Sequence, residues 1–320
     1  MPDNLHPLDL QHLTSVYLAL LISGGQVGLP VVVLTGLIYR KVTWHPTIIN
    51  FCVTWIVYSI IHCLYLYTGA GKDTLRLKIC IVQASMMYGA APMAVVAGLA
   101  IVLHAWTALQ CLEHTALCRV PRQLYLIVML GTPYLVFFVF SVGAGTFVMS
   151  QPQSVCSNGL YCIIRLHRAA LVAPSFCAAI MVIILALEAV ITVQYYRQWK
   201  TIKAAFPLVT RTPSRSLCFR FGLCCLYSCV TLTSAILFLS DVQTEVTYML
   251  PAALPLGALI VFGLRQDVIT AWFSVLRGRQ QSSSSFELEL PSARVASISN
   301  PTLTLVEFLE EIPGEPNIPV

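Results

Sequence analysis

Seven long apolar stretches alternate with short polar segments along the chain. A membrane-spanning helix needs about 20 predominantly apolar residues, and each stretch approaches or exceeds that length. The pattern predicts transmembrane helices at approximately Val16–Tyr39, Ile48–Tyr67, Ile79–Leu109, Leu124–Met149, Ala169–Tyr195, Phe221–Leu239 and Val246–Phe262. We therefore expect an all-α polytopic membrane protein, with a seven-transmembrane helix bundle over residues 16–264.

Composition supports lipid as the solvent for most of the chain. Of the 320 residues, 57% are hydrophobic and only 10% are charged, whereas soluble domains are about a quarter charged. So few charges cannot cover a water-facing surface of this size. The net charge of +5 is spread over several connecting segments, so we expect membrane lipid, and no nucleic acid, as a partner.

Residue placement excludes several kinds of chemistry. Every lysine lies in a connecting segment, so a retinal pigment, which needs a lysine inside the bundle, is excluded. Most of the twelve cysteines lie inside apolar stretches, where a cysteine usually serves as a small apolar filler. There is no CxxC pair and no His/Cys ligand cluster, so we expect no metal and no cofactor.

Prolines interrupt several of the apolar stretches. We expect Pro92, Pro133 and Pro174 inside helices and a kink at Pro30, while Pro251 and Pro255 interrupt the seventh stretch. Neighbouring helices and Ser or Thr side chains can satisfy the carbonyls that a proline frees inside a membrane. Soluble helices of this length tolerate such prolines poorly.

The Lys and Arg residues of the loops predict the orientation. With the N-terminus outside, thirteen of them lie on the cytoplasmic side and five on the outer side, as the positive-inside rule requires. We expect residues 1–15 to be extracellular, the C-terminus to be cytoplasmic and the plasma membrane to be the location. The polar start lacks the basic and apolar regions of a cleaved signal peptide.

The segment after the seventh stretch has its own pattern. Apolar residues recur on one helical face of 265–279 and basic residues flank them, which is typical of an amphipathic helix on the cytoplasmic leaflet. The alternative is a continuation of the seventh helix. From 280 to 320 a serine run, five prolines and six glutamates predict a disordered cytoplasmic tail.

A polar and aromatic stripe on the second predicted helix is a candidate ligand site. Its members are spaced three or four residues apart, which places them on one helix face. With a matching pair on the third helix, the candidate ligand-binding residues are Trp55, Tyr58, His62, Tyr65, Gln83 and Met87. An aromatic stripe of this kind can instead be packing or an interfacial belt, and both alternatives stay open.

Three cysteines lie on the predicted outer side. Cys80 opens the third helix, and Cys156 and Cys162 lie in the loop between the fourth and fifth helices. The outside of a cell is oxidising, so a disulfide can form there. We expect Cys80 to pair with Cys156 or with Cys162, the alternative being an unpaired Cys80.

Two charged features lie toward the cytoplasmic side. Glu188 is the one carboxylate inside an apolar stretch, and such a group is expensive in a membrane. It can reach toward the headgroups or pair with His104, which lies at a similar depth. The inner loop carries six basic residues, Arg197, Lys200, Lys203, Arg211, Arg215 and Arg220, which either follow the positive-inside rule or dock an acidic partner.

Together these features resemble G-protein-coupled receptors: seven helices, a cysteine opening the third, a basic third inner loop and an amphipathic helix after the seventh. The stretch Asn50–Ser59 looks like orphan seven-helix receptors of mushroom-forming fungi, and Phe262–Asp267 is similar to fungal lipopeptide-pheromone receptors. There are departures. His104-Ala-Trp106 replaces the Asp-Arg-Tyr motif, no Asn-Pro-x-x-Tyr closes helix seven, and helix six lacks a proline.

The resemblance implies a signal receptor with an unknown extracellular ligand and a heterotrimeric G protein as partner, and no enzymatic activity. It also makes the third and fifth helices neighbours, so His104 and Glu188 could form a resting-state lock in place of the missing motif. The alternatives are a seven-helix transporter and an intramembrane hydrolase. A zinc hydrolase needs several inward ligands, and a transporter needs inward charges near the midplane, which the pattern does not supply.

Overall fold

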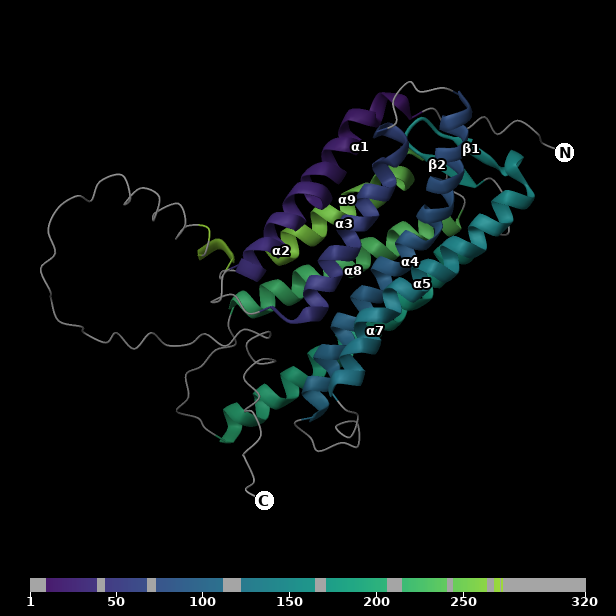
Figure 1. Ribbon diagram of the computed structural model, residues 1–320. Coiled ribbons are helices and arrows are strands. Elements are labelled where there is room, and N and C mark those ends of the chain that lie inside the picture. The colour runs from purple at the N-terminus through teal and green to yellow at the C-terminus, as the bar shows by residue number, and fades with distance from the viewer. Residues whose placement is uncertain are drawn as a thin grey trace, which may run out of the picture.

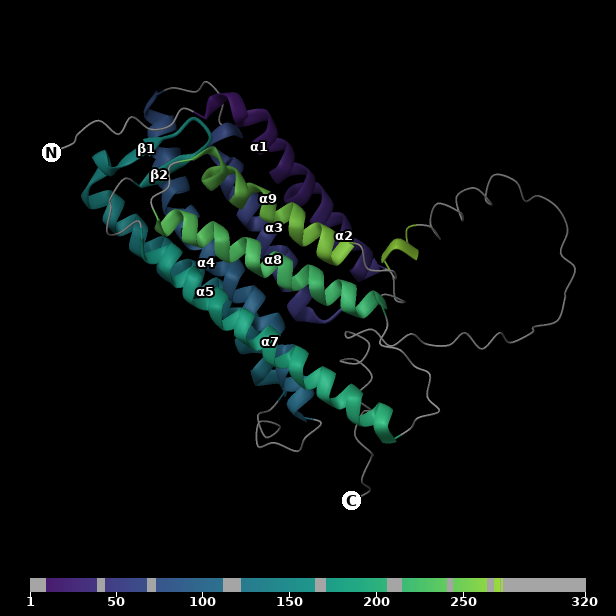
Figure 2. The same ribbon diagram turned by 180° about the vertical axis from the view of Figure 1, so that it is seen from behind.

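The computed structural model describes residues 10–38, 44–67, 73–111, 122–164, 171–205, 215–240, 244–263, 268–270 and 272. Within this part of the chain, seven helices are long and apolar enough to cross a membrane, one for each predicted stretch. The all-α seven-helix bundle is therefore confirmed. Figures 1 and 2 show the helices running roughly side by side along one long axis.

The first membrane helix consists of several segments. These are the 3-10 turn Gln11–Leu13, α1 (Thr14–Leu21), a π-helical segment Ile22–Gly28 and α2 (Leu29–Ile38). The other six are α3 (Pro46–Tyr67), α4 (Asp73–Cys111), α5 (Arg122–Ser150), α7 (Val172–Ala205), α8 (Arg215–Leu239) and α9 (Glu245–Gly263). Two short strands, β1 (Val155–Ser157) and β2 (Cys162–Ile164), pair antiparallel between α5 and α7.

Helix α4 holds the bundle together because it packs against α3, α5 and α7. The ring then continues from α7 to α8, from α8 to α9, and from α9 back to the first helix. Helix α5 lies at the periphery, because only 6% of its apolar membrane-crossing segment is buried inside the bundle, against 67% for α3. The large apolar side chains that α5 exposes therefore face lipid, while α3 supplies the centre of the core.

The three prolines expected inside helices all lie within helices. Pro92 is inside α4 and Pro133 is inside α5. Pro174 also lies within a helix, but in the first turn and not in the interior, because α7 begins at Val172. The backbone N–H of a first-turn residue has no acceptor within the helix, so a proline, which lacks this N–H, is favoured there. The neighbouring Ala173 N–H bonds instead to the Tyr88 hydroxyl of α4 at 3.3 Å.

The π-helical segment adapts the first helix to Pro30. The Leu29 N–H bonds to the Gly24 carbonyl five residues back, and the proline follows in the first turn of α2. The wider turn brings glycine backbone against neighbouring helices. A Cβ on Gly24 would lie 2.5 Å from the Leu256 backbone nitrogen of α9, and one on Gly25 would lie 1.8 Å from the Ser59 Oγ of α3. The Gly24-x-x-x-Gly28 spacing is typical of close helix contacts in membranes.

Replacing Gly24 by alanine is expected to destabilise the bundle, because the new methyl group meets backbone that cannot move away. Overpacking of this kind costs about 1–3 kcal/mol, so the thermal midpoint in detergent should fall. Gly131 on α5 is the matched control, since a Cβ there meets nothing within 4 Å. Gly131→Ala should leave the midpoint unchanged or raise it slightly. Equal effects of the two substitutions would contradict the close packing of the first helix.

Only part of the expected amphipathic segment 265–279 is described. Val268 is fully buried, and the Trp272 Nε1 donates to the Thr35 Oγ1 of α2 at 3.0 Å. These contacts attach the chain beyond α9 to the far end of the first helix. The remainder of 265–279 and the tail 280–320 lie outside the described residues.

Candidate functional site

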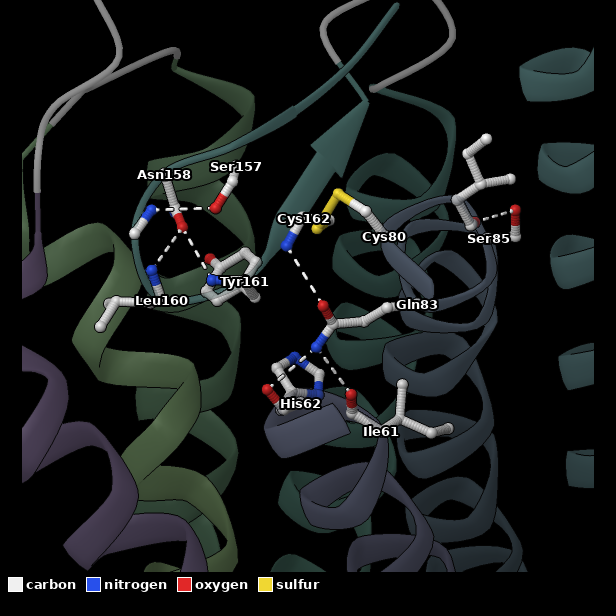
Figure 3. The surroundings of a disulfide bond; sticks show 12 residues. Ile61, His62, Cys80, Gln83, Ser85, Ser157, Asn158, Leu160, Tyr161 and Cys162 are labelled. Atoms are coloured by element: carbon white, nitrogen blue, oxygen red, sulfur yellow. Dashed lines mark hydrogen bonds between the residues drawn. A yellow bond between two sulfur atoms is a disulfide. The ribbon is translucent and has the colours of Figure 1, made fainter. Parts of the chain in front are cut away.

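A β-hairpin covers one end of the bundle. Its turn contains Asn158 and Gly159, and Gly159 has φ 89°, a left-handed conformation that favours glycine. The Asn158 Oδ1 accepts bonds from the Leu160 and Tyr161 backbone N–H groups at 3.1 and 2.9 Å. These bonds turn Leu160 and Tyr161 inward, where they are 0% and 4% exposed. Figure 3 shows the turn beside the disulfide.

A disulfide fixes this hairpin to α4. Cys80 is bonded to Cys162 of β2, with Cα atoms 5.3 Å apart. The disulfide expected at Cys80 is therefore confirmed, and of the two partners that the sequence left open, Cys162 is the one used. Cys156 lies on the paired strand opposite Ile163. We call this the disulfide end of the bundle, and the other end, near the α4–α5 connection, the opposite end.

Gln83 joins three elements directly beneath the disulfide. Its Nε2 donates to the Ile61 and His62 carbonyls of α3 at 2.9 and 3.1 Å. Its Oε1 accepts from the Cys162 N–H at 3.3 Å. The side chain is fully buried, and Figure 3 shows it between α3 and β2. Its hydrogen-bonding groups are thus occupied by the protein, so its role here is to position the hairpin.

Below the hairpin lies a continuous series of ring contacts that we call the aromatic cluster. Its members are Tyr17, Phe51, Trp55, Tyr58, His62, Tyr161, Tyr227 and Tyr248. Tyr161 contacts His62 at a centroid distance of 5.9 Å, and His62 stacks on Tyr58 at 3.8 Å. Tyr58 contacts Trp55 at 4.9 Å. The hairpin, α1, α3, α8 and α9 therefore all contribute rings to one interior region.

Three polar atoms in the aromatic cluster are buried without a hydrogen-bond partner. They are the Tyr17 hydroxyl, the Trp55 Nε1 and the Tyr227 hydroxyl. A buried polar group that makes no hydrogen bond costs roughly 1–3 kcal/mol, and nearly all such groups in proteins are satisfied. Three in one cluster therefore indicate a place for a hydrogen-bonding ligand or for water.

Tyr161 is the cluster member that comes from outside the membrane helices. Burial, with further contributions from the nearby phenols of Tyr58 and Tyr248, raises the pKa of its hydroxyl well above the usual range. The hydroxyl therefore stays protonated at physiological pH. It brings a neutral donor, not a charge, to the top of the cluster.

The residues expected to form the ligand site divide into two groups. Trp55, Tyr58 and His62 are 2%, 3% and 5% exposed and belong to the aromatic cluster, so the stripe on α3 faces the interior. Tyr65 packs beside the disulfide, and Met87 is partly buried against the main core.

The sequence pattern did not identify five members of the cluster, Tyr17, Phe51, Tyr161, Tyr227 and Tyr248. Phe51 had a usable signal, because it lies one turn before Trp55 on α3. Tyr161 also had a usable signal, because it directly precedes a disulfide cysteine and follows Asn158–Gly159, a dipeptide typical of tight turns. The other three lie alone on apolar helices. Only the packing of helices from distant parts of the chain identifies them.

Substituting phenylalanine for Tyr17 tests whether its hydroxyl has any structural partner. Removal of an unsatisfied buried hydroxyl should leave the thermal midpoint unchanged or raise it, by up to about 1 kcal/mol in stability. Tyr134 is the matched control, since its hydroxyl donates to the Asn50 Oδ1 at 2.7 Å. Tyr134→Phe should lose about 1 kcal/mol. A loss of similar size in Tyr17→Phe would show that its hydroxyl is already satisfied.

At the opposite end, the contacts described for His104 and Glu188 are with other residues, so their expected pairing stays a prediction. The Glu188 Oε1 accepts from the Ser228 Oγ of α8 at 3.0 Å. His104 stacks on His45 with ring centroids 3.7 Å apart. Counting residues gave both side chains a similar depth, but the rotation of α4 and α7 about their axes turns them to different neighbours.

The basic inner loop is only partly described. Arg197 and Lys200 are exposed on α7, which continues to Ala205. Arg215 and Arg220 begin α8, but nothing is described of their side chains or of that of Lys203. Arg211 lies outside the described residues. In the described part of the chain, no group of three His, Cys, Asp or Glu residues could hold a metal ion.

Neither a protein-family model nor a curated protein matches this chain. The candidate site must therefore be judged from its own geometry and chemistry.

Proposed function

We propose that the protein is a seven-helix signal receptor that binds an uncharged, largely apolar ligand at the aromatic cluster and couples to a heterotrimeric G protein. The observation that carries this proposal is the aromatic cluster itself. A disulfide-anchored hairpin closes over an interior region with three partnerless polar atoms, at Tyr17, Trp55 and Tyr227. Small-molecule sites are mostly apolar with a few convergent polar groups.

The chemistry of the ligand follows from what surrounds the cluster. Among the described residues, Glu188 is the only buried Asp, Glu, Lys or Arg, and it lies between α7 and α8, in contact with Ser228. A cationic or anionic ligand would leave its charge unpaired in the bundle. The Trp55 Nε1 can only donate, so the ligand carries an acceptor such as a carbonyl, ester or ether oxygen.

Two independent arguments support an extracellular disulfide end. Disulfides persist in oxidising compartments and are rare in the cytosol, and Cys80–Cys162 lies at this end. The Lys and Arg bias of the loops, thirteen against five, supports a cytoplasmic location of the opposite end. The ligand site is then near the outside, and Arg197 and Lys200 of α7 lie on the side where a G protein would bind.

This orientation can be tested with a reporter fused after Arg279. We expect a protease added to intact cells to leave the reporter uncut, and to cut it after the membrane is permeabilised. A second reporter at the N-terminus serves as the control and should already be cut in intact cells. Cleavage of the C-terminal reporter in intact cells would overturn the orientation and the coupling side with it.

Ligand binding can be tested on the purified protein with a panel of uncharged lipophilic esters, ketones and alcohols. A ligand at one hundred times its Kd stabilises the native state by about 2.7 kcal/mol, which raises the thermal midpoint. Tyr17→Phe and Tyr227→Phe should fold normally but show a reduced shift with the compound that stabilises the wild type. A shift that both variants retain in full would place the ligand elsewhere.

A further inference from the structure

The interface between α7 and α8 contains a buried carboxyl group. Glu188 is 5% exposed and lies within the membrane span Val172–Arg197. Its Oε1 accepts a hydrogen bond from the Ser228 Oγ at 3.0 Å, and the Cys225 thiol of α8 lies beside the same carboxyl. Its Oε2 is buried and has no hydrogen-bond partner.

No cation neutralises this carboxyl within the described part of the chain. The one ion pair there joins His12 to Glu245 at the disulfide end. The titratable groups that act on the carboxyl from α8 are the thiols of Cys224 and Cys225. Helix α4 also packs on α7, but its His104 stacks on His45. With only the described neighbours around it, an ionised Glu188 would be a charge inside a membrane without a cation beside it, which is strongly unfavourable.

The groups around Glu188 decide which ligand could neutralise it. A hard cation such as Na⁺ or Ca²⁺ prefers several oxygen ligands, whereas Ser228 supplies one hydroxyl oxygen and the other neighbours are thiols. A soft metal would need a third ligand, and no group of three His, Cys, Asp or Glu is found among the described residues. A proton needs a single oxygen, and the partnerless Oε2 provides it.

We propose that Glu188 is a proton-binding site whose occupancy controls the packing of α7 against α8. In the packed state, a proton from water is held on the carboxyl, which is neutral and accepts the Ser228 hydrogen bond. When the proton returns to water, the carboxylate needs hydration, so α7 and α8 must separate where Glu188 and Ser228 meet. Because the packed state binds the proton more tightly than the separated state, raising the pH favours separation.

This inference does not require the protein to be a receptor. If the proposed function holds, the proton site regulates it, since α7 also carries Arg197 and Lys200. A lock between His104 and Glu188 would join the third and fifth helices. The proposed proton site instead joins the fifth and sixth, α7 and α8, through the Ser228–Glu188 contact.

Infrared difference spectroscopy of the purified full-length protein in lipid nanodiscs tests the proton directly. The wild type minus Glu188→Gln should show a protonated-carboxyl C=O band that disappears as the pH is raised from mildly acidic to alkaline. Ser228→Ala should shift the frequency of this band, because it removes the hydrogen bond to Oε1. Identical carboxyl spectra of wild type and Glu188→Gln at every pH would overturn the proposal.

A distance measurement tests the coupling to helix packing. Genetically encoded spin labels at the exposed positions Val193 on α7 and Leu226 on α8 should move apart in the wild type as the pH rises. In Glu188→Gln, which cannot ionise, the short distance should persist at every pH. Glu245→Gln, at the exposed ion pair of the other end, is the control and should respond like the wild type. A wild-type distance independent of pH would refute the coupling, whatever the outcome of the G-protein experiments.

Discussion

Replacing Cys80 by serine is expected to lower the free energy of unfolding by about 4.5 kcal/mol. The Cys80–Cys162 disulfide closes a loop between two residues that are 82 positions apart. Without the disulfide, the unfolded chain regains the conformational entropy that the closed loop had removed. The hairpin would then be held on α4 by Gln83 and by local packing alone. We expect a large drop in the thermal midpoint in detergent and easier proteolysis between α5 and α7.

Cys156→Ser is the matched control for this prediction, because Cys156 lies on the same hairpin but not in this disulfide. It should unfold close to the wild-type midpoint. Cys80 is a better residue to replace than Cys162, because without Cys80 no substitute disulfide can form between Cys80 and Cys156. A Cys80→Ser midpoint equal to that of wild type would mean that the disulfide contributes nothing to stability.

Replacing Gln83 by glutamate is expected to cost about 4 kcal/mol. The Gln83 Nε2 faces two carbonyl oxygens at 2.9 and 3.1 Å, and the substitution puts a carboxyl oxygen there. The new carboxyl group must either carry a buried, uncompensated charge or take up a proton. A protonated carboxyl can donate only one hydrogen bond, so one of the two carbonyls would lose its donor. The readout is the thermal midpoint, measured with intact disulfide.

Gln83→Leu separates the effect of charge from the loss of hydrogen bonds. It leaves the Cys162 N–H without its acceptor, for which we expect a loss of about 2 kcal/mol. Val82 is the neighbouring control, since it is 50% exposed and Val82→Leu should change little. If Gln83→Glu were no worse than Gln83→Leu, the two carbonyl contacts would not determine which residue fits here.

The seven helices could be predicted because each is a long stretch almost free of charge, and membrane thickness sets its length. The helix boundaries were less certain. Pro174 looked interior because the apolar stretch begins at Ala169, whereas the helix begins at Val172. Apolar composition does not say where a chain starts to turn, but a proline is often found in the first turn.

The candidate site was predicted only where a single helix carries it. The spacing of Trp55, Tyr58 and His62 was enough to place them on one helix face, and the packing of the bundle shows that this face is buried. Gln83 was predicted as a ligand-binding residue, but not as the link to the hairpin, because its acceptor role depends on Cys162 from a distant loop. The π-helical segment Ile22–Gly28 and its contact with α9 likewise depend on partners far along the chain.

The partners of His104 and Glu188 could not be predicted for a similar physical reason. Distance along a helix follows from 1.5 Å per residue, so depth can be counted from the sequence. The direction of a side chain depends on how the helix is rotated, and packing against neighbours sets that rotation. Ser228 gave no signal as a partner, because serines are common in membrane helices and satisfy themselves on their own backbone.

We propose that this seven-helix protein acts as a receptor for a heterotrimeric G protein. The most direct test is guanine-nucleotide exchange on purified G-protein heterotrimers of each class, reconstituted with the disulfide-intact protein in nanodiscs. We predict that the protein accelerates exchange on at least one class, and that Arg197→Glu combined with Lys200→Glu reduces the acceleration while leaving the thermal midpoint unchanged. Exchange no faster than with empty nanodiscs, for every class and with the stabilising ligand present, would contradict the account.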